Sequence, residues 1–280
     1  MSYLIDQITK HMLSKEKKGA KNTFWAGETE ANAFDIYHRW AGTEPTNPPD
    51  TEKLMMFQAA KLIEQAYVDM FADMGILLTS EEEQSRIEMN RKGVPISGYM
   101  DAMLRYMGRD VVCEIKTYYG DWHEKDLMND KPRESYLKQL AVYLDATGLE
   151  EGLLFYVNRG TGRQFQFVLE RKGTKCKCKD IEFDLNDVYS RWADIYEYVQ
   201  KGEAPPSDFT YKFDIEELDW TEVSKSDISK ARNGHKVLGD WQALYSDYKD
   251  LLVEAEGSRL GYSFEEMARI KELTTGYTKW

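Results

Sequence analysis

Apolar and polar side chains alternate through residues 98–119, GYMDAMLRYMGRDVVCEIKTYY, as expected for strands that bury one face. The Gly108-Arg109 pair near the middle predicts a turn, so the segment is expected to form a β-hairpin. One face of this hairpin is apolar and predicts contact with a core. That face carries Met100, Ala102, Leu104, Cys113 and Ile115.

The other face of the predicted hairpin carries charge. With the turn placed there, Asp101 faces Lys116 and Met103 faces Glu114, so the two carboxylates are diagonal neighbours. Carboxylates held together raise each other's pKa unless a cation offsets them. A hard divalent ion such as Mg²⁺ suits such a site, and Lys116 would orient its water or stabilise charge. The alternative is a plain Asp101–Lys116 ion pair with Glu114 exposed.

The whole-chain composition indicates a globular protein. The 280 residues are 42% hydrophobic and 31% charged, enough for one large domain or two small ones. The start of the chain lacks the apolar core of a signal peptide, and the apolar stretches are strand-sized, so we expect a cytoplasmic protein without a membrane span. Three cysteines cannot form a disulfide framework.

The charge distribution bears on whether nucleic acid is a partner. A net charge of -12 argues against it, because phosphate binding needs local Lys and Arg. Residues 159–179, however, are strongly basic and carry only Glu170 as an acid. Either a basic surface on an acidic protein or a solvated hairpin with ordinary surface charge would account for this. The basic residues are Arg159, Arg163, Arg171, Lys172, Lys175, Lys177 and Lys179.

Periodicity and turn residues predict the order α-β-β-α-β-β-β-α, with no internal repeat. This order favours an α/β fold, a mixed central sheet flanked by helices, with N- and C-terminal segments around it. The predicted helices cover residues 51–75, 132–148, 186–202 and 237–257, and the strands after the hairpin cover 152–158, 163–170 and 179–185.

Two helices add polar residues to the hairpin. Gln139 and Tyr143 are spaced i and i+4 on one helix face, and Glu64 lies among apolar residues of the long helix. The ordinary interpretation is a helix surface with one half-buried tyrosine for Gln139 and Tyr143, and a solvated helix face for Glu64.

Together these motifs resemble the PD-(D/E)XK nuclease superfamily, and specifically its RecB-like exonuclease branch. That branch has an acid or histidine on a helix, then G-x-x-D, E-x-K and Q-x-x-x-Y. The matching segments here are Glu64, GYMD ending at Asp101, EIK at 114–116 and QLAVY at 139–143. The flanking segments YHRWAGTEPTNP and FQAAKLIEQ are similar to those of CRISPR-associated and phage exonucleases, so the resemblance covers about residues 24 to 256.

The resemblance implies a restriction-endonuclease-like fold in a single nuclease domain over residues 1–280, with a core at about 52–202 and packed segments at 1–51 and 205–280. It also implies metal ligands, water activation by Lys116, and positioning of DNA or water by Gln139 and Tyr143. The implied ligands of Mg²⁺ or Mn²⁺ are Glu64, Asp101, Glu114 and the Ile115 carbonyl.

Two departures from the branch concern cofactors. The cysteines that commonly hold an iron–sulfur cluster there are replaced by Asn32, Ala243, Ser246 and Leu252, so we expect no cluster and apolar packing between the two ends. The usual histidine of the long helix corresponds to Lys61, which cannot ligate while protonated. Either Glu64 completes the metal site, which we favour, or a single ion binds well and catalysis is weaker.

The resulting hypothesis is a Mg²⁺- or Mn²⁺-dependent DNA exonuclease that processes linear ends in recombination or repair, phage-encoded and with a single-strand annealing protein as a candidate partner. Two alternatives stay open: a catalytically weak DNA-binding or adaptor subunit, and a defence-system endonuclease. Polarity, strand preference and oligomeric state do not follow from the chain.

Overall fold

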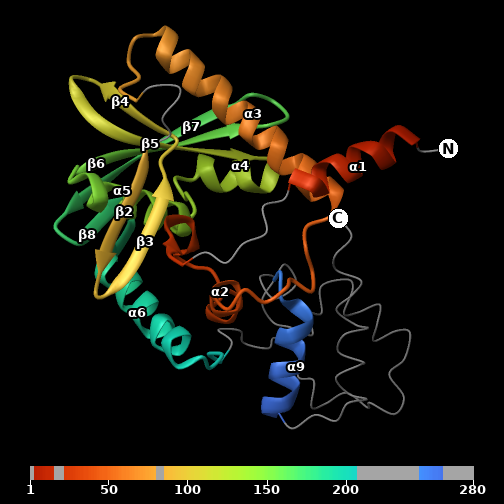
Figure 1. Cartoon of the computed structure of the whole chain (residues 1–280). Coiled ribbons are helices and arrows are strands. Elements are labelled where there is room, and N and C mark those ends of the chain that lie inside the picture. The colour runs from red at the N-terminus through yellow and green to blue at the C-terminus, as the bar shows by residue number, and fades with distance from the viewer. Residues whose placement is uncertain (1–2, 16–21, 80–84, 207–245, 261–280) are drawn as a thin grey trace. The chain divides into compact units, whose positions relative to one another are not determined.

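The computed structural model describes residues 3–15, 22–79, 85–206 and 246–260 (Figure 1). The chain divides into two compact units, which are described separately. One contains Met1–Ala31 and Asp50–Glu197, and the other contains Asn32–Pro49 and Tyr198–Trp280. Among the described residues, no helix is both long and apolar enough to cross a membrane.

The described part of the first unit contains a six-stranded sheet in the order β4-β5-β6-β7-β8-β9. Neighbouring strands are antiparallel except β5 and β6, which are parallel. The strand bounds are β4 Ala102–Tyr106, β5 Arg109–Tyr118, β6 Glu151–Asn158, β7 Gln164–Lys172, β8 Lys175–Cys178 and β9 Ile181–Asp184.

A three-stranded sheet of the same unit has the order β1-β3-β2 among the described residues, with β1 Phe24–Trp25, β2 Arg86–Arg91 and β3 Val94–Tyr99. The chain passes from β3 of this sheet to β4 of the larger one through Met100 and Asp101. The first strand of the predicted hairpin is therefore divided between two sheets, and Asp101 lies at the crossover.

Two helices cover opposite faces of β5 and β6. Phe71 of α3 (Thr51–Asp73) packs on the apolar cluster around Cys113 and Ile115. Figure 1 shows α3 lying alongside the larger sheet. On the other face, Lys116 lies over the Tyr136 ring of α5 (Glu134–Thr147), with its Nζ 5.0 Å from the ring centroid. The charged face of the hairpin is thus covered by α5.

The remaining helices of the described residues are all shorter than α3. They are α1 Tyr3–Lys15, the 3-10 turn η1 Ala26–Glu28, α2 Ala33–Trp40, α4 Asp121–Met128, α6 Leu185–Lys201 and α9 Lys249–Leu260.

The mixed α/β fold class, with sheets flanked by helices, is confirmed and is consistent with a restriction-endonuclease-like core. The predicted strands and the helices at 51–75, 132–148 and 186–202 are present within a few residues. The first half of the predicted helix at 237–257 lies outside the described residues. Sequence reasoning did not predict α1, β1, α2, β2, most of β3, the break before β4, α4 or β8. Strand β8 has only the four residues KCKC. The predicted domain boundaries stay a prediction.

The predicted hairpin register is wrong by two residues. Met107 and Gly108 form the turn, with φ of 47° and 79°, and Ala102 pairs with Cys113. Two successive positive φ angles give a turn whose twist suits a hairpin, which the Gly108-Arg109 placement overlooked. A slip of one residue would exchange the faces, whereas a slip of two preserves them, so the predicted apolar face is still buried, although the opposite face of β5 is buried at Val112 and Glu114 as well.

The described part of the second unit joins the segment after Asn32 to the segment around Ser246. The Asn47 N–H donates to the Asp247 carbonyl at 2.9 Å, and Ser246 Oγ lies 2.6 Å from a carboxylate oxygen of Asp35. The rings of His38 and Tyr248 are 5.3 Å apart. Phe34, Tyr248 and Leu252 are buried, so apolar side chains accompany these hydrogen bonds in the described part of this unit.

Candidate active site

Strand β5 holds Glu114 and Lys116 on the face that α5 covers. The Glu114 side chain is only 1% exposed and forms an ion pair with Lys116 Nζ, whose side chain is 21% exposed. The alternative of an Asp101–Lys116 pair with an exposed Glu114 is therefore wrong. A carboxylate this deeply buried is costly to keep charged, so its partners determine what the site can do.

Asp101 is held at the edge of the sheet by a backbone donor. Its Oδ2 accepts a 2.7 Å hydrogen bond from the Ile115 N–H, which lies beyond the last β4–β5 pair. Strand β4 begins only at Ala102, so it does not extend far enough to pair with Ile115. The Asp101 carboxylate takes the position that the backbone of a longer β4 would have occupied. The crossover between the sheets thereby fixes Asp101 beside β5.

Glu64 reaches the same place from α3. Its half-buried carboxyl shares a hydrogen bond with Asp101, whereas Lys61, one turn earlier, is exposed. The structure thus brings Glu64, rather than Lys61, to the carboxylates of the hairpin.

The carboxyls of this cluster have raised pKa values. Burial, followed by the charge of Asp101, raises the pKa of Glu114 to about 8 and that of Glu64 to about 7. Burial likewise raises the pKa of Asp101. Burial would lower the pKa of Lys116, but the charges of Glu114 and Asp101 outweigh it and raise that pKa. The positive charge of Lys116 therefore does not fully offset the negative charge of the three carboxylates.

The chemistry of the cluster suits an added cation. Glu114 Oε2 is buried and has no hydrogen-bond partner among the described residues, and the neighbouring donors are carboxylate oxygens, which Mg²⁺ and Mn²⁺ prefer. Within the described ranges, no group of three or more His, Cys, Asp or Glu side chains stands ready in ligating geometry. Mg²⁺ commonly uses one or two carboxylates and several waters, so this donor set still fits such an ion.

Gln139 and Tyr143 form a chain of hydrogen bonds to the crossover. Gln139 Nε2 donates to the Tyr143 hydroxyl at 3.1 Å, and that hydroxyl donates to the Tyr99 carbonyl at 2.8 Å. Tyr143 is 2% exposed, and its ring lies against Gly98, where a β-carbon would be 2.8 Å from Tyr143 Cε1. The glycine of G-x-x-D thus makes room for the tyrosine of Q-x-x-x-Y.

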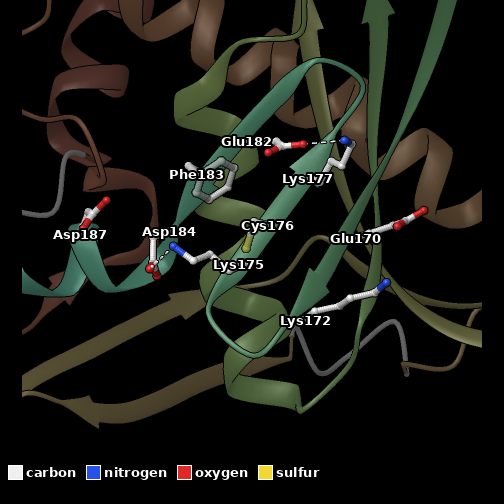
Figure 2. A pocket seen from close by; sticks show the side chains of 9 residues that line it. All are labelled: Glu170, Lys172, Lys175, Cys176, Lys177, Glu182, Phe183, Asp184 and Asp187. Carbon is white, nitrogen blue, oxygen red and sulfur yellow. Dashed lines mark hydrogen bonds and ion pairs between the residues drawn. The ribbon is translucent and has the colours of Figure 1, made fainter.

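The basic run at residues 159–179 does not form a free basic face. Lys175 and Lys177 reach across to Asp184 and Glu182 at 2.8 and 2.5 Å, as Figure 2 shows. These contacts lower the pKa of Asp184 to about 2, through Lys175 first, and also lower that of Glu182.

Other cations of the run are also paired: Lys179 with Asp130, Arg171 with Asp145 and Arg163 with Glu124. The cavity of about 480 Å³ in Figure 2 is lined by both signs of charge. Of the two interpretations, the solvated hairpin with paired charges is the one that the described residues support.

A second cavity, beside Lys116, was missed. It is lined by residues from the end of β5, from α4 and from the start of α5, among them Thr117, Trp122 and Tyr136. The sequence signal was the aromatic segment TYYGDWH directly after EIK, of which only TYY was predicted, as the end of a strand.

The positions that correspond to cluster cysteines serve other purposes. Asn32 accepts from the Phe34 N–H as the cap of α2, Ser246 accepts from the Tyr248 N–H, and Leu252 is buried. Ala243 lies outside the described residues. The absence of an iron–sulfur cluster stays a prediction.

The chain was compared with known proteins. No protein-family model matches it, and no curated protein matches it. Solved structures with a similar arrangement include SSO0001, at 17% identity and a TM-score of 0.41, which covers 81% of this chain and 96% of that one. They also include an alkaline exonuclease, LHK-Exo, from Laribacter hongkongensis, at 16% identity and a TM-score of 0.43, covering 70% of this chain and 93% of that one. A structure of LHK-Exo in complex with dAMP has 13% identity, a TM-score of 0.41 and the same coverage. At these identities and TM-scores the neighbours carry no argument about activity, which has to rest on this chain's own residues.

Proposed function

We propose that the chain is a Mg²⁺- or Mn²⁺-dependent deoxyribonuclease. The observation that supports this best is Glu114, buried, paired with Lys116 and close to Asp101 and Glu64, with one carboxylate oxygen left without a partner among the described residues. A buried excess of carboxylate suits a divalent cation, and a lysine beside it suits stabilisation of a phosphate.

The roles follow from the contacts. Glu64, Asp101, Glu114 and the Ile115 carbonyl would hold the ion, which when bound would supply a water of lowered pKa and neutralise phosphate charge. Lys116, partly exposed, would leave Glu114 for a phosphate oxygen or the attacking water. Tyr143 and Gln139, bonded to the Tyr99 carbonyl, would position the crossover that carries Asp101.

The choice of DNA ends as substrate rests on the motif resemblance, and so does a single-strand annealing protein as partner. The weakly catalytic DNA-binding subunit is favoured by one observation, the exposed Lys61 in place of a ligand. One experiment distinguishes the metal-dependent nuclease from the weakly catalytic DNA-binding subunit.

End-labelled linear DNA and closed circular DNA are incubated with the protein, with and without Mg²⁺ or Mn²⁺. We expect metal-dependent loss of the label from linear DNA and little change in the circle. Glu114→Ala should abolish this loss, and Glu182→Ala, which removes an exposed, paired carboxylate, should not. Binding of DNA without cleavage in either metal would contradict the proposed function and favour the DNA-binding subunit.

A further inference from the structure

A small aromatic cavity adjoins Lys116 but takes no part in the roles given above. Its volume is about 220 Å³, below the roughly 300–1,000 Å³ of sites that enclose a drug-sized ligand, so it suits one flat group with the rest of a ligand outside. At its mouth Tyr119 and Trp122 are 68% and 66% exposed. Large aromatic side chains so exposed beside a cavity mark a candidate binding surface.

The two aromatic residues are held in place. The His123 Nδ1 donates to the Tyr119 carbonyl at 3.2 Å, while its Nε2 accepts from Arg133, and its ring meets Trp122 edge-on at 4.8 Å. This pairing requires a neutral imidazole, and burial together with the charge of Arg133 lowers the pKa of His123 accordingly. A β-carbon at Gly160 would lie 3.2 Å from the Tyr119 ring, so the β6–β7 loop supports that ring closely.

Positive charge lines the same cavity. The lining has three cationic side chains, Lys131, Arg133 and Arg159, and one acidic side chain, Asp126. The charges of β7–β9 are balanced by comparison. Arg159 Nε is buried and has no hydrogen-bond partner among the described residues, so a ligand oxygen could satisfy it.

The Tyr136 ring is shared by the cavity and the surroundings of Lys116. Tyr136 lines the cavity and also lies 5.0 Å from Lys116 Nζ and 5.8 Å from the Arg133 guanidinium. A phosphate near Lys116 would therefore leave the neighbouring nucleotide within reach of the aromatic residues.

We infer that this cavity binds unpaired nucleotides of a DNA strand next to the cleaved bond, with a base stacked on Trp122 and a phosphate at Arg159. The inference rests on the proposed function. Bases in a duplex are already stacked and paired, so only an unpaired base can offer its face to Trp122. The substrate class is thus DNA with a single-stranded segment at the reacting end.

Binding without cleavage tests this inference. In EDTA, the anisotropy of a labelled DNA hairpin with a single-stranded thymidine tail is compared with that of the same hairpin with a blunt end. The parent protein should bind the tailed DNA more tightly. Trp122→Ala should weaken that binding about tenfold and leave blunt-end binding unchanged, while Trp122→Phe should keep most of it. Phe57→Ala, which removes another exposed aromatic side chain, on α3, is the matched control and should have no effect.

Salt dependence separates stacking from charge. Trp122→Ala should not change the slope of log affinity against log salt, whereas Arg159→Gln should reduce that slope by about 0.7, the value for one phosphate of a single strand. Equal affinity of the parent and Trp122→Ala for the tailed DNA would overturn the inference. If the proposed function is wrong, the result is different: the parent protein still binds the tailed DNA but cleaves no DNA in the presence of metal.

Discussion

Two charged regions of the first unit handle their charges in opposite ways. On the β8–β9 hairpin, Lys175 and Lys177 each have an acidic partner at the surface, and the pKa values of those acids are lowered. Around β5, Glu114 and Asp101 gather at Lys116 below the surface, and their pKa values are raised. The charges of the first region are balanced without a ligand, whereas the second region carries more negative charge than its described neighbours offset.

The contrast explains why the density of charge in the sequence was a poor guide. The run at residues 159–179 is the most basic stretch that we identified, yet its cations are largely offset by acids from other segments. A single E-x-K triplet is unremarkable by composition, but it is built into a buried strand. Burial, more than the number of charges, distinguishes a site from a solvated surface.

The largest expected effect is on cleavage. Glu114→Ala and Lys116→Ala should each lower the rate on linear DNA by at least about a hundredfold, because one loses a ligand and the other a stabilising charge. Glu114→Ala should also weaken metal binding, whereas Lys116→Ala should leave metal affinity nearly unchanged. Rates at saturating metal and metal affinities by calorimetry measure both. Lys177→Ala is the matched control and should cleave at the parent rate. If Glu114→Ala or Lys116→Ala also cleaved at the parent rate, the charges around β5 would be no more functional than the paired surface charges.

A smaller effect is expected at Glu64. Glu64→Gln keeps the shape and removes the charge, so it should raise the Mg²⁺ concentration for half-maximal activity about tenfold. Lys61→His should lower it, and more so in Mn²⁺, because Mn²⁺ accepts imidazole more readily than Mg²⁺ does. Metal titrations on one linear DNA measure this. An unchanged titration for Glu64→Gln would mean that α3 supplies no ligand.

The raised pKa of Glu114 predicts how stability depends on pH without metal. Because the folded carboxyl titrates near 8 instead of 4.5, its contribution is fully present below about pH 4.5 and is lost as the pH rises through about 8. Urea unfolding in EDTA should show a loss on the order of 5 kcal/mol across that window. Glu114→Gln imitates the protonated form and should flatten the curve, and Mg²⁺ should restore stability at high pH. A flat curve for the parent would contradict the buried excess of charge.

The smallest effect is expected on the β8–β9 hairpin. Glu182→Gln removes one exposed partner of Lys177, and exposed pairs of this kind contribute little, so the melting temperature should not change measurably. Added salt should be equally ineffective there. A clear drop in the melting temperature would show that these surface pairs are more than solvated charges.

Sequence reasoning predicted the local elements well and their connections less well. The alternation around Cys113 and Ile115 was enough to identify the buried face, because a two-residue error in register leaves faces unchanged. It could not predict that the chain changes sheets at Asp101, since that depends on Tyr143, a residue from a distant helix. The partners of the basic run were equally out of reach, because Asp130 and Asp145 come from other elements.

The close contact between Gly98 and Tyr143 also bears on the order of folding. The ring can occupy its place only after α5 has docked against both sheets, and the crossover that carries Asp101 is bonded to that ring through the Tyr99 carbonyl. Contacts between segments so far apart in the chain are slow to form, because the intervening loop must close first. Helix α3 and the β4–β5 hairpin are local structures and should form early. The carboxylates would therefore be brought together late, so an intermediate with its secondary structure intact would still lack the charge cluster.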